Sequence, residues 1–411
     1  MWYIYIMSDT GFLLKNCSQV LTMSGEGLGI VEKGYVVVED GRVSVVCDHP
    51  RCCVTEKLPE IDCGGCVVMP GFVDPHTHLV FGGWRADEFE ARLEGRSYKE
   101  IAEAGGGILS TVRATRKASE EELYQRSLKL LKEMVSYGTT TVEIKSGYGL
   151  SCEDELKILR VAKRLGESGL VTVVPTFLGA HSVPEGTAKS DYIEEVVSKM
   201  IPMVVKEGLA KFCDVFCENF VFNAQESKEI LEVGKIFGLL PTIHCDEIEP
   251  SGGAEVAGEV GAVSASHLLK PSETGLKAMA EKGVVAVLLP GTTFFLQERH
   301  KPPVARLLEL RITIALGSDF NPGSCTLLSQ MLTAQLGCIY YGLSIVEALR
   351  GVTINAAKAL RLEQELGSLE PGKWADIVVT DVPDYRHLIY RLGHNPVRMV
   401  FRHGSLVYSG S

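Results

Sequence analysis

Four side chains that commonly bind metal ions are spread along the chain, and each follows a short apolar run. They are His76, His78, His244 and Asp319. Three imidazoles and one carboxylate, with room left for water, are a ligand set typical of a hydrolytic metal centre. These nitrogen and oxygen donors suit Zn or Fe(II), whereas Mg and Ca prefer more oxygen ligands. The sequence therefore predicts a metal centre that activates water.

The pair His76-Thr77-His78 is the strongest part of this pattern. Successive side chains of a strand alternate between its two faces, so both imidazoles point to the same side. A single histidine in a core is usually a hydrogen-bonded structural residue. Because two histidines share one rigid element here, we interpret the pair as half of a metal site.

The ligands must be brought together by the elements that carry them. Eight apolar runs in the middle of the chain indicate β-strands, and the segments between them have helical spacing and end in glycine. Eight strand-helix units favour a (β/α)8 TIM barrel, in which functional residues lie at the carboxyl ends of strands. Each predicted ligand ends its run. The runs cover residues 67–78, 139–147, 172–181, 212–218, 239–247, 262–268, 284–291 and 312–319.

The two ends of the chain resemble each other and differ from the middle. Short β-rich pieces occupy residues 11–68, and in YVVVEDGRVSVV the Asp-Gly between apolar runs indicates a hairpin. The last segment repeats this style. We therefore predict an α/β protein with a small β-sandwich domain formed by residues 1–68 and 361–411. The barrel hydrolase domain is predicted over residues 69–360.

Composition limits the partners of this chain. With 411 residues and a formal net charge of −11, it lacks the long basic run that nucleic acid would favour, so a small-molecule substrate is expected. No apolar stretch reaches membrane-spanning length, and the opening segment MWYIYIMSDTGF lacks the features of a secretion signal. We predict a cytoplasmic protein without membrane contact, with a homodimer as the default assembly.

The chain contains twelve cysteines, which secreted proteins use for disulfide bonds and cytosolic proteins use for metal binding or catalysis. Cys63-Gly-Gly-Cys66 has the spacing of half a zinc ribbon or of a redox pair. A second well-placed CxxC is missing. We interpret these cysteines as small apolar or turn residues rather than as a structural zinc site.

The HxH pair, the later single histidine and the Ser-Asp after an apolar strand resemble the amidohydrolase superfamily of metal-dependent barrel hydrolases. Binuclear members of that superfamily carry a carboxylated lysine at the end of the fourth strand. Here the fourth run ends in Cys217-Glu218 without a lysine. The resemblance therefore implies one divalent ion, Zn or Fe, per subunit. Lys145 on the second run is the alternative bridging lysine.

Two further residues indicate the type of reaction. Glu247 stands three residues after His244, and His267 ends the sixth run. Either could be a surface acid or a buried structural histidine. Beside a bound metal, a carboxylate and an imidazole suit general acid-base catalysis. The pattern resembles mononuclear members of the superfamily that attack C–N bonds of small heterocycles, both deaminases and cyclic amide hydrolases.

Longer motifs resemble one family among these, the imidazolonepropionases. They run from HTHLVFGGWRADEF to STVRATR and include VEIKSGYGL, TFLGAHSVP, LLPGTTFFLQE and GSDFNPGS. This resemblance implies hydrolytic opening of 4-imidazolone-5-propanoate to N-formimino-L-glutamate in histidine degradation. The N-terminal sixty residues match the family only in general β-rich style.

The same resemblance implies a set of substrate-binding residues. Arg85 matches the substrate-binding arginine of the family, and its forked guanidinium suits a carboxylate tail. A salt bridge to Asp87 or Glu88 is the alternative interpretation of Arg85. The glycines at 105–107 could cradle a phosphate, but no following Lys-Ser or Lys-Thr completes a nucleotide-binding loop. The remaining matches are Tyr148, His181, Glu247, Asn321, Gly323 and Ser324.

Catalytic roles follow as a hypothesis. His267 assists deprotonation of water, Glu247 hydrogen-bonds the ring nitrogen, and Asp319 passes a proton to the leaving nitrogen, with the order of transfers left open. An alternative is a cytosine- or guanine-type aminohydrolase of the same superfamily, although a neutral nucleobase does not require Arg85. A non-catalytic barrel acting as a scaffold is the third interpretation, disfavoured because all ligands and both acid-base candidates occur together.

Overall fold

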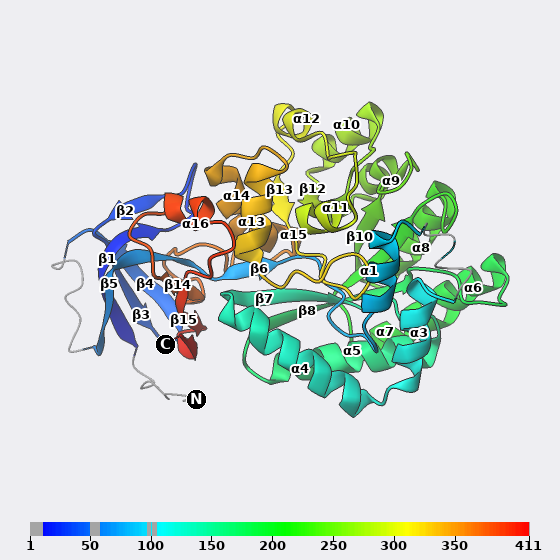
Figure 1. The fold of residues 1–411 in the computed structure, drawn as a ribbon, viewed down its shortest axis with the longest axis horizontal. Helices are drawn as coiled ribbons and strands as arrows, with labels where there is room; N and C mark the ends of the chain where they lie inside the picture. Colours follow the sequence, from blue (N-terminus) through cyan, green and yellow to red (C-terminus); the bar gives the residue numbers. More distant parts are fainter. Residues whose placement is uncertain (1–10, 50–57, 97–99, 101–104, 411) are drawn as a thin grey trace.

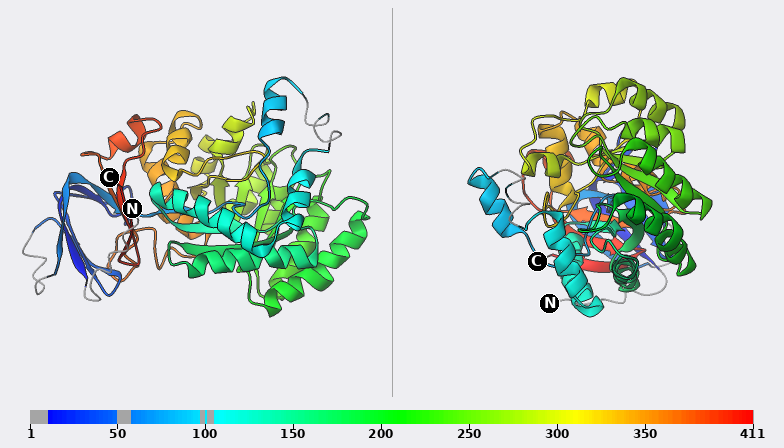
Figure 2. Two further views of the ribbon diagram at one scale, coloured as in Figure 1. Left: turned by 60° about the horizontal axis from the view of Figure 1, so that its bottom comes forward. Right: turned by 90° about the vertical axis from the view of Figure 1, so that its right-hand side faces the viewer.

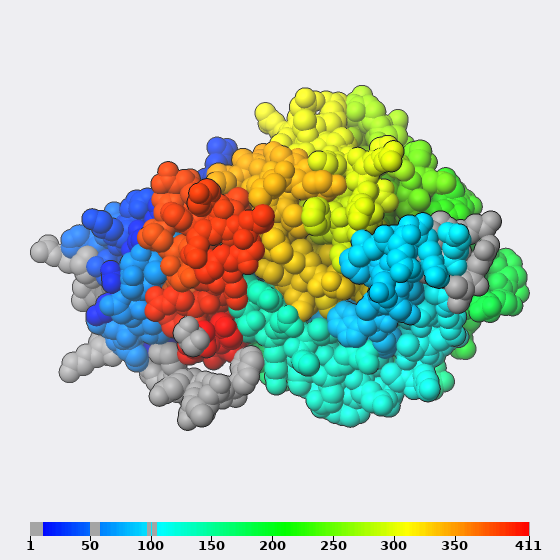
Figure 3. Space-filling model, viewed as in Figure 1, coloured from blue at the N-terminus to red at the C-terminus, as the bar shows by residue number. Residues whose placement is uncertain are grey.

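The computed structural model describes residues 11–49, 58–96, 100 and 105–410. These residues form two units that lie side by side (Figure 1). The smaller unit is β-rich and combines both ends of the chain, and the larger is an α/β unit between them. In the space-filling view of Figure 3, the C-terminal segment lies between the N-terminal strands and the larger unit.

Eight parallel strands of the larger unit follow one another in sequence order. The first and last strands meet just beyond their ends, where Thr77 and Phe320 form a parallel bridge and the Asp319 amide donates to the His76 carbonyl over 3.0 Å. The predicted TIM barrel is confirmed. The strands are β6 (Phe72–Asp74), β7 (Thr139–Lys145), β8 (Thr172–Ala180), β9 (Phe212–Cys217), β10 (Leu240–Cys245), β11 (Ser264–His267), β12 (Val285–Leu288) and β13 (Ile314–Leu316).

Helices cover the outside of this barrel (Figures 1 and 2). Those between β6 and β9 are α1 (Ala86–Leu93), α3 (Ile108–Lys117), α4 (Glu120–Ser136), α5 (Cys152–Glu167), α6 (Lys189–Glu195), the π-helical turn η2 (Val196–Met200) and α7 (Ile201–Lys206). Later ones are α8 (Ala224–Ile236), α9 (Gly253–Val260), α10 (Glu273–Lys282), α11 (Pro290–Phe295), α12 (Val304–Glu309), α13 (Gln330–Ile339), α14 (Ile345–Gly351) and α15 (Ile354–Ala359).

Helix α4 shows why these segments become helical. Ser119 and Glu122 form a capping box that satisfies backbone amides of the first turn. The helix ends at Ser136, and Gly138 follows with a φ of 93°, which disfavours other residues. One face is apolar at spacings of three and four and packs toward the strands. Its buried residues are Leu123, Ser127, Leu130, Leu131, Met134 and Val135.

Strand composition explains why chemistry concentrates at one end of the barrel. A parallel strand covered on both faces reads as a continuous apolar run, and all four residues of β12 are buried. Strand β7 is also buried along its length, yet it ends in the charged residues Glu143 and Lys145. Polar residues are therefore concentrated at the carboxyl ends of strands, where the loops begin.

One curled, mostly antiparallel sheet forms the smaller unit, with strands from both ends of the chain (Figure 2). The predicted hairpin is present at Asp40 and Gly41, which have φ values of 49° and 74°. Phe12 and Phe401 stack in its core at 4.8 Å. The strands are β1 (Phe12–Leu21), β2 (Ile30–Glu32), β3 (Tyr35–Glu39), β4 (Arg42–Cys47), β5 (Glu60–Pro70), β14 (Ile377–Thr380), β15 (Val397–Arg402) and β16 (Ser405–Ser409), and the short helix α16 (Arg386–Tyr390) precedes β15.

Cys63 and Cys66 lie on β5, where both are buried. Cys52 and Cys53 lie outside the described residues. Among the helices that the structure describes, none is both long enough and apolar enough to span a membrane. The division of the chain at residues 68/69 and 360/361 stays a prediction.

Candidate active site

The four predicted ligands converge at the carboxyl ends of β6, β10 and β13. Nitrogens of His76, His78 and His244 all lie within 4.8 Å of one another. The Nε2 atoms of His78 and His244 are 3.5 Å apart. Asp319 Oδ1 lies 3.5 Å from His76 Nε2 and 3.6 Å from His78 Nε2. Donors held about 2.1 Å from a tetrahedral ion lie about 3.4 Å from each other, so these spacings fit one ion.

Burial of this cluster also fits a metal. His76 Nε2 is buried without a hydrogen-bond partner, which is costly for a polar atom unless something else satisfies it. Burial lowers the pKa of His76 and of His78 well below the ordinary range. Both imidazoles are therefore neutral at physiological pH, and neutral imidazole is the form that binds metal.

Neighbouring side chains orient two of the imidazoles. His76 Nδ1 lies 2.9 Å from Ser266 Oγ, and His244 Nδ1 lies 3.0 Å from Asp214 Oδ1. A carboxylate that accepts from Nδ1 fixes the tautomer of a histidine and leaves Nε2 free to bind a metal. The Nε2 atoms of both histidines thus face the centre of the cluster.

Asp214 belongs to a buried charge network behind His244. Lys145 Nζ donates to Asp214 Oδ2 and to Glu143 Oε1, each over 2.7 Å. Burial opposes the charge of Lys145, but Asp214 and Glu143 outweigh it and raise its pKa. Burial likewise opposes ionisation of Asp214, yet Lys145 and His244 hold its pKa below the usual range. Lys145 is therefore an ammonium ion between two carboxylates.

Asp319 has a strained backbone conformation, and its two carboxylate oxygens make different contacts. Its φ of 52° is unusual for a residue other than glycine. Thr292 Oγ1 donates to Oδ2 over 2.6 Å, while Asn321 Nδ2 donates to Oδ1 over 3.2 Å. Burial raises the pKa of Asp319 to about 6. Oδ1 consequently faces the histidines and Oδ2 is fixed by Thr292.

The two acid-base candidates face each other beside the ligands. Glu247 Oε1 is 3.4 Å from His267 Nδ1, and the His267 ring centre is 5.5 Å from that of His244. Burial raises the pKa of Glu247 well above its ordinary value, and the nearby carboxylates of Asp319 and Glu218 add to the effect. Burial lowers the pKa of His267. The structure thus brings a carboxyl group and a neutral imidazole together at the cluster.

Tyr148 and His181 lie beside His78. The ring centre of His78 is 5.0 Å from that of His181 and 5.7 Å from that of Tyr148. His181 Nδ1 contacts the carbonyl of Gly147 at 3.0 Å, and burial lowers the pKa of His181 to about 3. Both side chains therefore border the space next to the metal ligands.

Arg85 lies against the loop that follows β13. Its Nε donates to Glu88 Oε2 over 2.9 Å, so the alternative salt bridge is present, but the Arg85 side chain is only 13% exposed. A Cβ at Gly323 would overlap the Arg85 guanidinium, so the glycine allows the guanidinium to lie close to this loop. Asn321 Oδ1 accepts from the amides of Gly323 and Ser324 over 2.8 Å each and shapes this loop.

Three residues of the site were not predicted from the sequence: Asp214, Ser266 and Thr292. Asp214 lies inside the apolar strand FCDVFC, and an acid in such a strand is a signal that would have found it. Ser266 and Thr292 carry no comparable signal, because a buried hydroxyl is ordinary in a strand or a helix.

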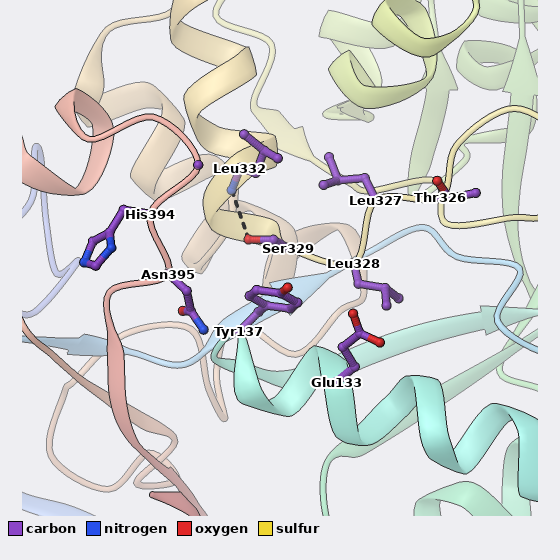
Figure 4. Close-up of a pocket in the computed structure, with 10 residues that line it drawn as sticks. Glu133, Tyr137, Thr326, Leu327, Leu328, Ser329, Leu332, His394 and Asn395 are labelled. Atoms are coloured by element: carbon purple, nitrogen blue, oxygen red, sulfur yellow. Dashed lines mark hydrogen bonds between the residues drawn. The ribbon is translucent and has the colours of Figure 1, made fainter. Parts of the chain in front are cut away.

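A cavity of about 200 Å³ lies elsewhere, between α4, the segment after the 321–324 loop and the C-terminal segment. Figure 4 shows Tyr137, Ser329 and Asn395 around it. None of the predicted site residues lines this cavity, so it is separate from the metal ligands.

Known proteins resemble this chain along its length. The amidohydrolase family matches residues 67–407. Imidazolonepropionases from Geobacillus sp. strain WCH70 and from Geobacillus kaustophilus are 48% and 45% identical to it, each over 96% of this chain and 97% of their own length. A solved adenosine deaminase from Xanthomonas campestris with bound zinc has a TM-score of 0.74 at 18% identity, covering 97% of this chain and 92% of that one. This last likeness shows the fold.

Proposed function

The chain belongs to the amidohydrolase family and, within it, to the imidazolonepropionases, and from this premise we propose where and how its reaction takes place. The reaction is hydrolytic opening of 4-imidazolone-5-propanoate to N-formimino-L-glutamate, at the carboxyl end of the barrel. The observation that carries the placement is the convergence of three imidazoles and Asp319 beside the Glu247–His267 pair.

We propose that the cluster holds one divalent ion, Zn or Fe, through His76, His78, His244 and Asp319. Two observations support a single ion. The end of β9 offers Glu218 rather than a lysine, and Lys145 is committed to ion pairs with Asp214 and Glu143. When bound, such an ion makes water acidic and polarises a carbonyl group.

The protein side chains supply the remaining steps. His267 Nε2 takes the proton from the attacking water, because burial keeps its imidazole neutral and able to accept. Burial and the neighbouring carboxylates raise the pKa of Glu247 and so favour its protonated form, whose carboxyl group can hold a ring nitrogen by hydrogen bonding. Asp319 passes on to the leaving nitrogen the proton that His267 took from water, so that both side chains end the reaction in the protonation state in which they began.

We assign the carboxylate tail of the substrate to Arg85, with Tyr148, His181, Asn321, Gly323 and Ser324 forming the rest of the binding surface. The Arg85 Nε is used by Glu88, which orients the guanidinium and leaves its Nη atoms beside the 321–324 loop. A forked cation suits a carboxylate, because it can bind both oxygens.

Replacing Arg85 with alanine should raise KM roughly ten- to hundredfold and change kcat less, because a charged hydrogen bond to the substrate is lost. Steady-state kinetics measure both parameters. Arg85→Lys keeps the positive charge but lacks the forked guanidinium, so its KM should lie between those of the unmodified enzyme and Arg85→Ala. An unchanged KM in Arg85→Ala would show that Arg85 does not bind the carboxylate tail of the substrate.

The proposed reaction is tested by adding freshly generated imidazolone propanoate to the metal-loaded protein and following the loss of its ultraviolet absorbance. We expect turnover, and we expect chelation to abolish it. Cytosine and guanine are tested in parallel for ammonia release. Ammonia release at useful rates without loss of the imidazolone would support the aminohydrolase alternative instead.

We further propose a cytoplasmic homodimer that acts on a small molecule and has no nucleic acid or membrane partner. The acidic composition of the chain supports the part of this proposal that excludes nucleic acid. Size-exclusion chromatography with light scattering tests the assembly: a monomer would overturn it.

A further inference from the structure

Glu218 is completely buried and carries four hydrogen bonds from a single loop. It follows β9, and its Oε1 accepts from the backbone amides of Glu247 and Ile248 over 2.8 and 2.9 Å. Its Oε2 accepts from the Glu249 amide over 3.1 Å and from Ser251 Oγ over 2.7 Å. One carboxylate therefore ties the loop after β10 to the neighbouring strand.

The hydrogen bonds to Glu218 stabilise one conformation of the loop. Three successive backbone amides that point at one buried anion form strong, charge-assisted hydrogen bonds and compensate its burial. The far end of the loop is tied separately, because Asp246 accepts from the amides of Ser251 and Ala254 over 2.8 and 2.9 Å. Glu218 thus determines the backbone at Glu247 itself.

The Glu247 side chain contacts His267, while its backbone is held by Glu218. Its Oε1 lies 3.4 Å from His267 Nδ1, whereas the Glu247 amide is bound to Glu218. We propose that Glu218 is a positioning residue for the reaction, because it sets where the Glu247 carboxyl group meets the substrate ring. This inference rests on the proposed function.

Glu218→Gln tests the proposal, because it keeps the side-chain shape but turns an NH₂ group toward backbone donors. A displacement of the loop by a fraction of an ångström up to 1 Å should lower kcat/KM roughly ten- to hundredfold. Metal content should stay unchanged, because none of the ligands is touched. An unaltered kcat/KM in folded Glu218→Gln would overturn the proposal.

A double-mutant cycle separates positioning from general stability. If Glu218 acts through Glu247, then adding Glu218→Gln to Glu247→Gln should change kcat/KM by less than about twofold. A purely structural role would give the same fold-loss in both backgrounds, and that result would contradict the proposal even if the single variant is impaired.

Two matched controls come from this chain. Glu249→Gln removes the same charge from an exposed side chain of the same loop and should leave kcat/KM near normal. Glu155 is a second buried clamp, whose carboxylate accepts from the amides of Gly149 and Leu150 over 2.7 and 2.8 Å beside Tyr148. Glu155→Gln should lower activity additively with Glu247→Gln, because it holds a different loop. Non-additivity of that pair would show that the cycle does not resolve individual loops, and the proposal would fall.

If Glu218→Gln does not fold, Ser251→Ala removes one donor to the same carboxylate and should give a smaller loss, again absent in the Glu247→Gln background. No loss in Ser251→Ala would then overturn the inference. Failure of the proposed function is a distinct outcome, because the unmodified enzyme itself would not consume imidazolone propanoate.

Discussion

Replacing His267 with phenylalanine is expected to lower kcat roughly 10²- to 10⁴-fold while the bound metal remains. A positioned general base contributes about that much to a proton transfer. Phenylalanine keeps the ring volume, and His267 is outside the proposed ligand set, so the fold and the metal site should persist. The measurements are steady-state kcat on imidazolone propanoate, metal analysis and the thermal unfolding midpoint. Glu247→Gln should behave in the same way.

His403→Phe is the matched control for this prediction. His403 stacks on Trp374 in the smaller unit at 4.1 Å, far in the sequence from the ligands, and its replacement should leave kcat near normal. Near-normal turnover in both His267→Phe and Glu247→Gln would contradict their roles. Loss of metal from His267→Phe would instead make His267 a ligand.

Replacing Asp319 with alanine is expected to have the second large effect. Asp319 is the anionic donor of the cluster and the proposed carrier of a proton, so both binding and chemistry should suffer. We expect weaker metal binding, measured by competition with a chelator, and a loss of kcat of more than about 10³-fold at saturating metal.

Asp214→Asn is a comparison variant that should weaken metal binding without removing a proton-transferring group, and it therefore separates the two roles proposed for Asp319. Asp214 contacts His244 Nδ1 and lies behind the ligands, so its replacement should weaken metal binding about 10- to 100-fold but restore most turnover when metal is saturating. If Asp319→Ala also recovered normal turnover at saturating metal, its role in proton transfer would be wrong.

The barrel was predictable because strand periodicity survives in the sequence. All eight runs form parallel strands in the expected order, and the ends of the chain form one β unit. The ligands were predictable for the same reason, since the end of a parallel strand lies at the edge where the other strands end. His76, His244 and Asp319 illustrate this directly.

Contacts between loops were not predictable, because they depend on pairings across the barrel rather than on local spacing. Ser266 contacts His76, although the two residues are 190 positions apart in the sequence. In the sequence, Glu218 stands out only because it occupies the position of a possible bridging lysine, whereas in the structure its carboxylate binds the loop that carries Glu247. Left-handed backbone at His267 and Asp319, with φ of 71° and 52°, also has no local signal in residue type.

The most direct test of the account is a metal titration of the metal-free protein with Zn or Fe(II), following consumption of imidazolone propanoate. We predict no turnover before addition, a linear rise, and a break at one equivalent per chain. Turnover by the metal-free protein, or a break at two equivalents, would contradict a single catalytic ion held by His76, His78, His244 and Asp319.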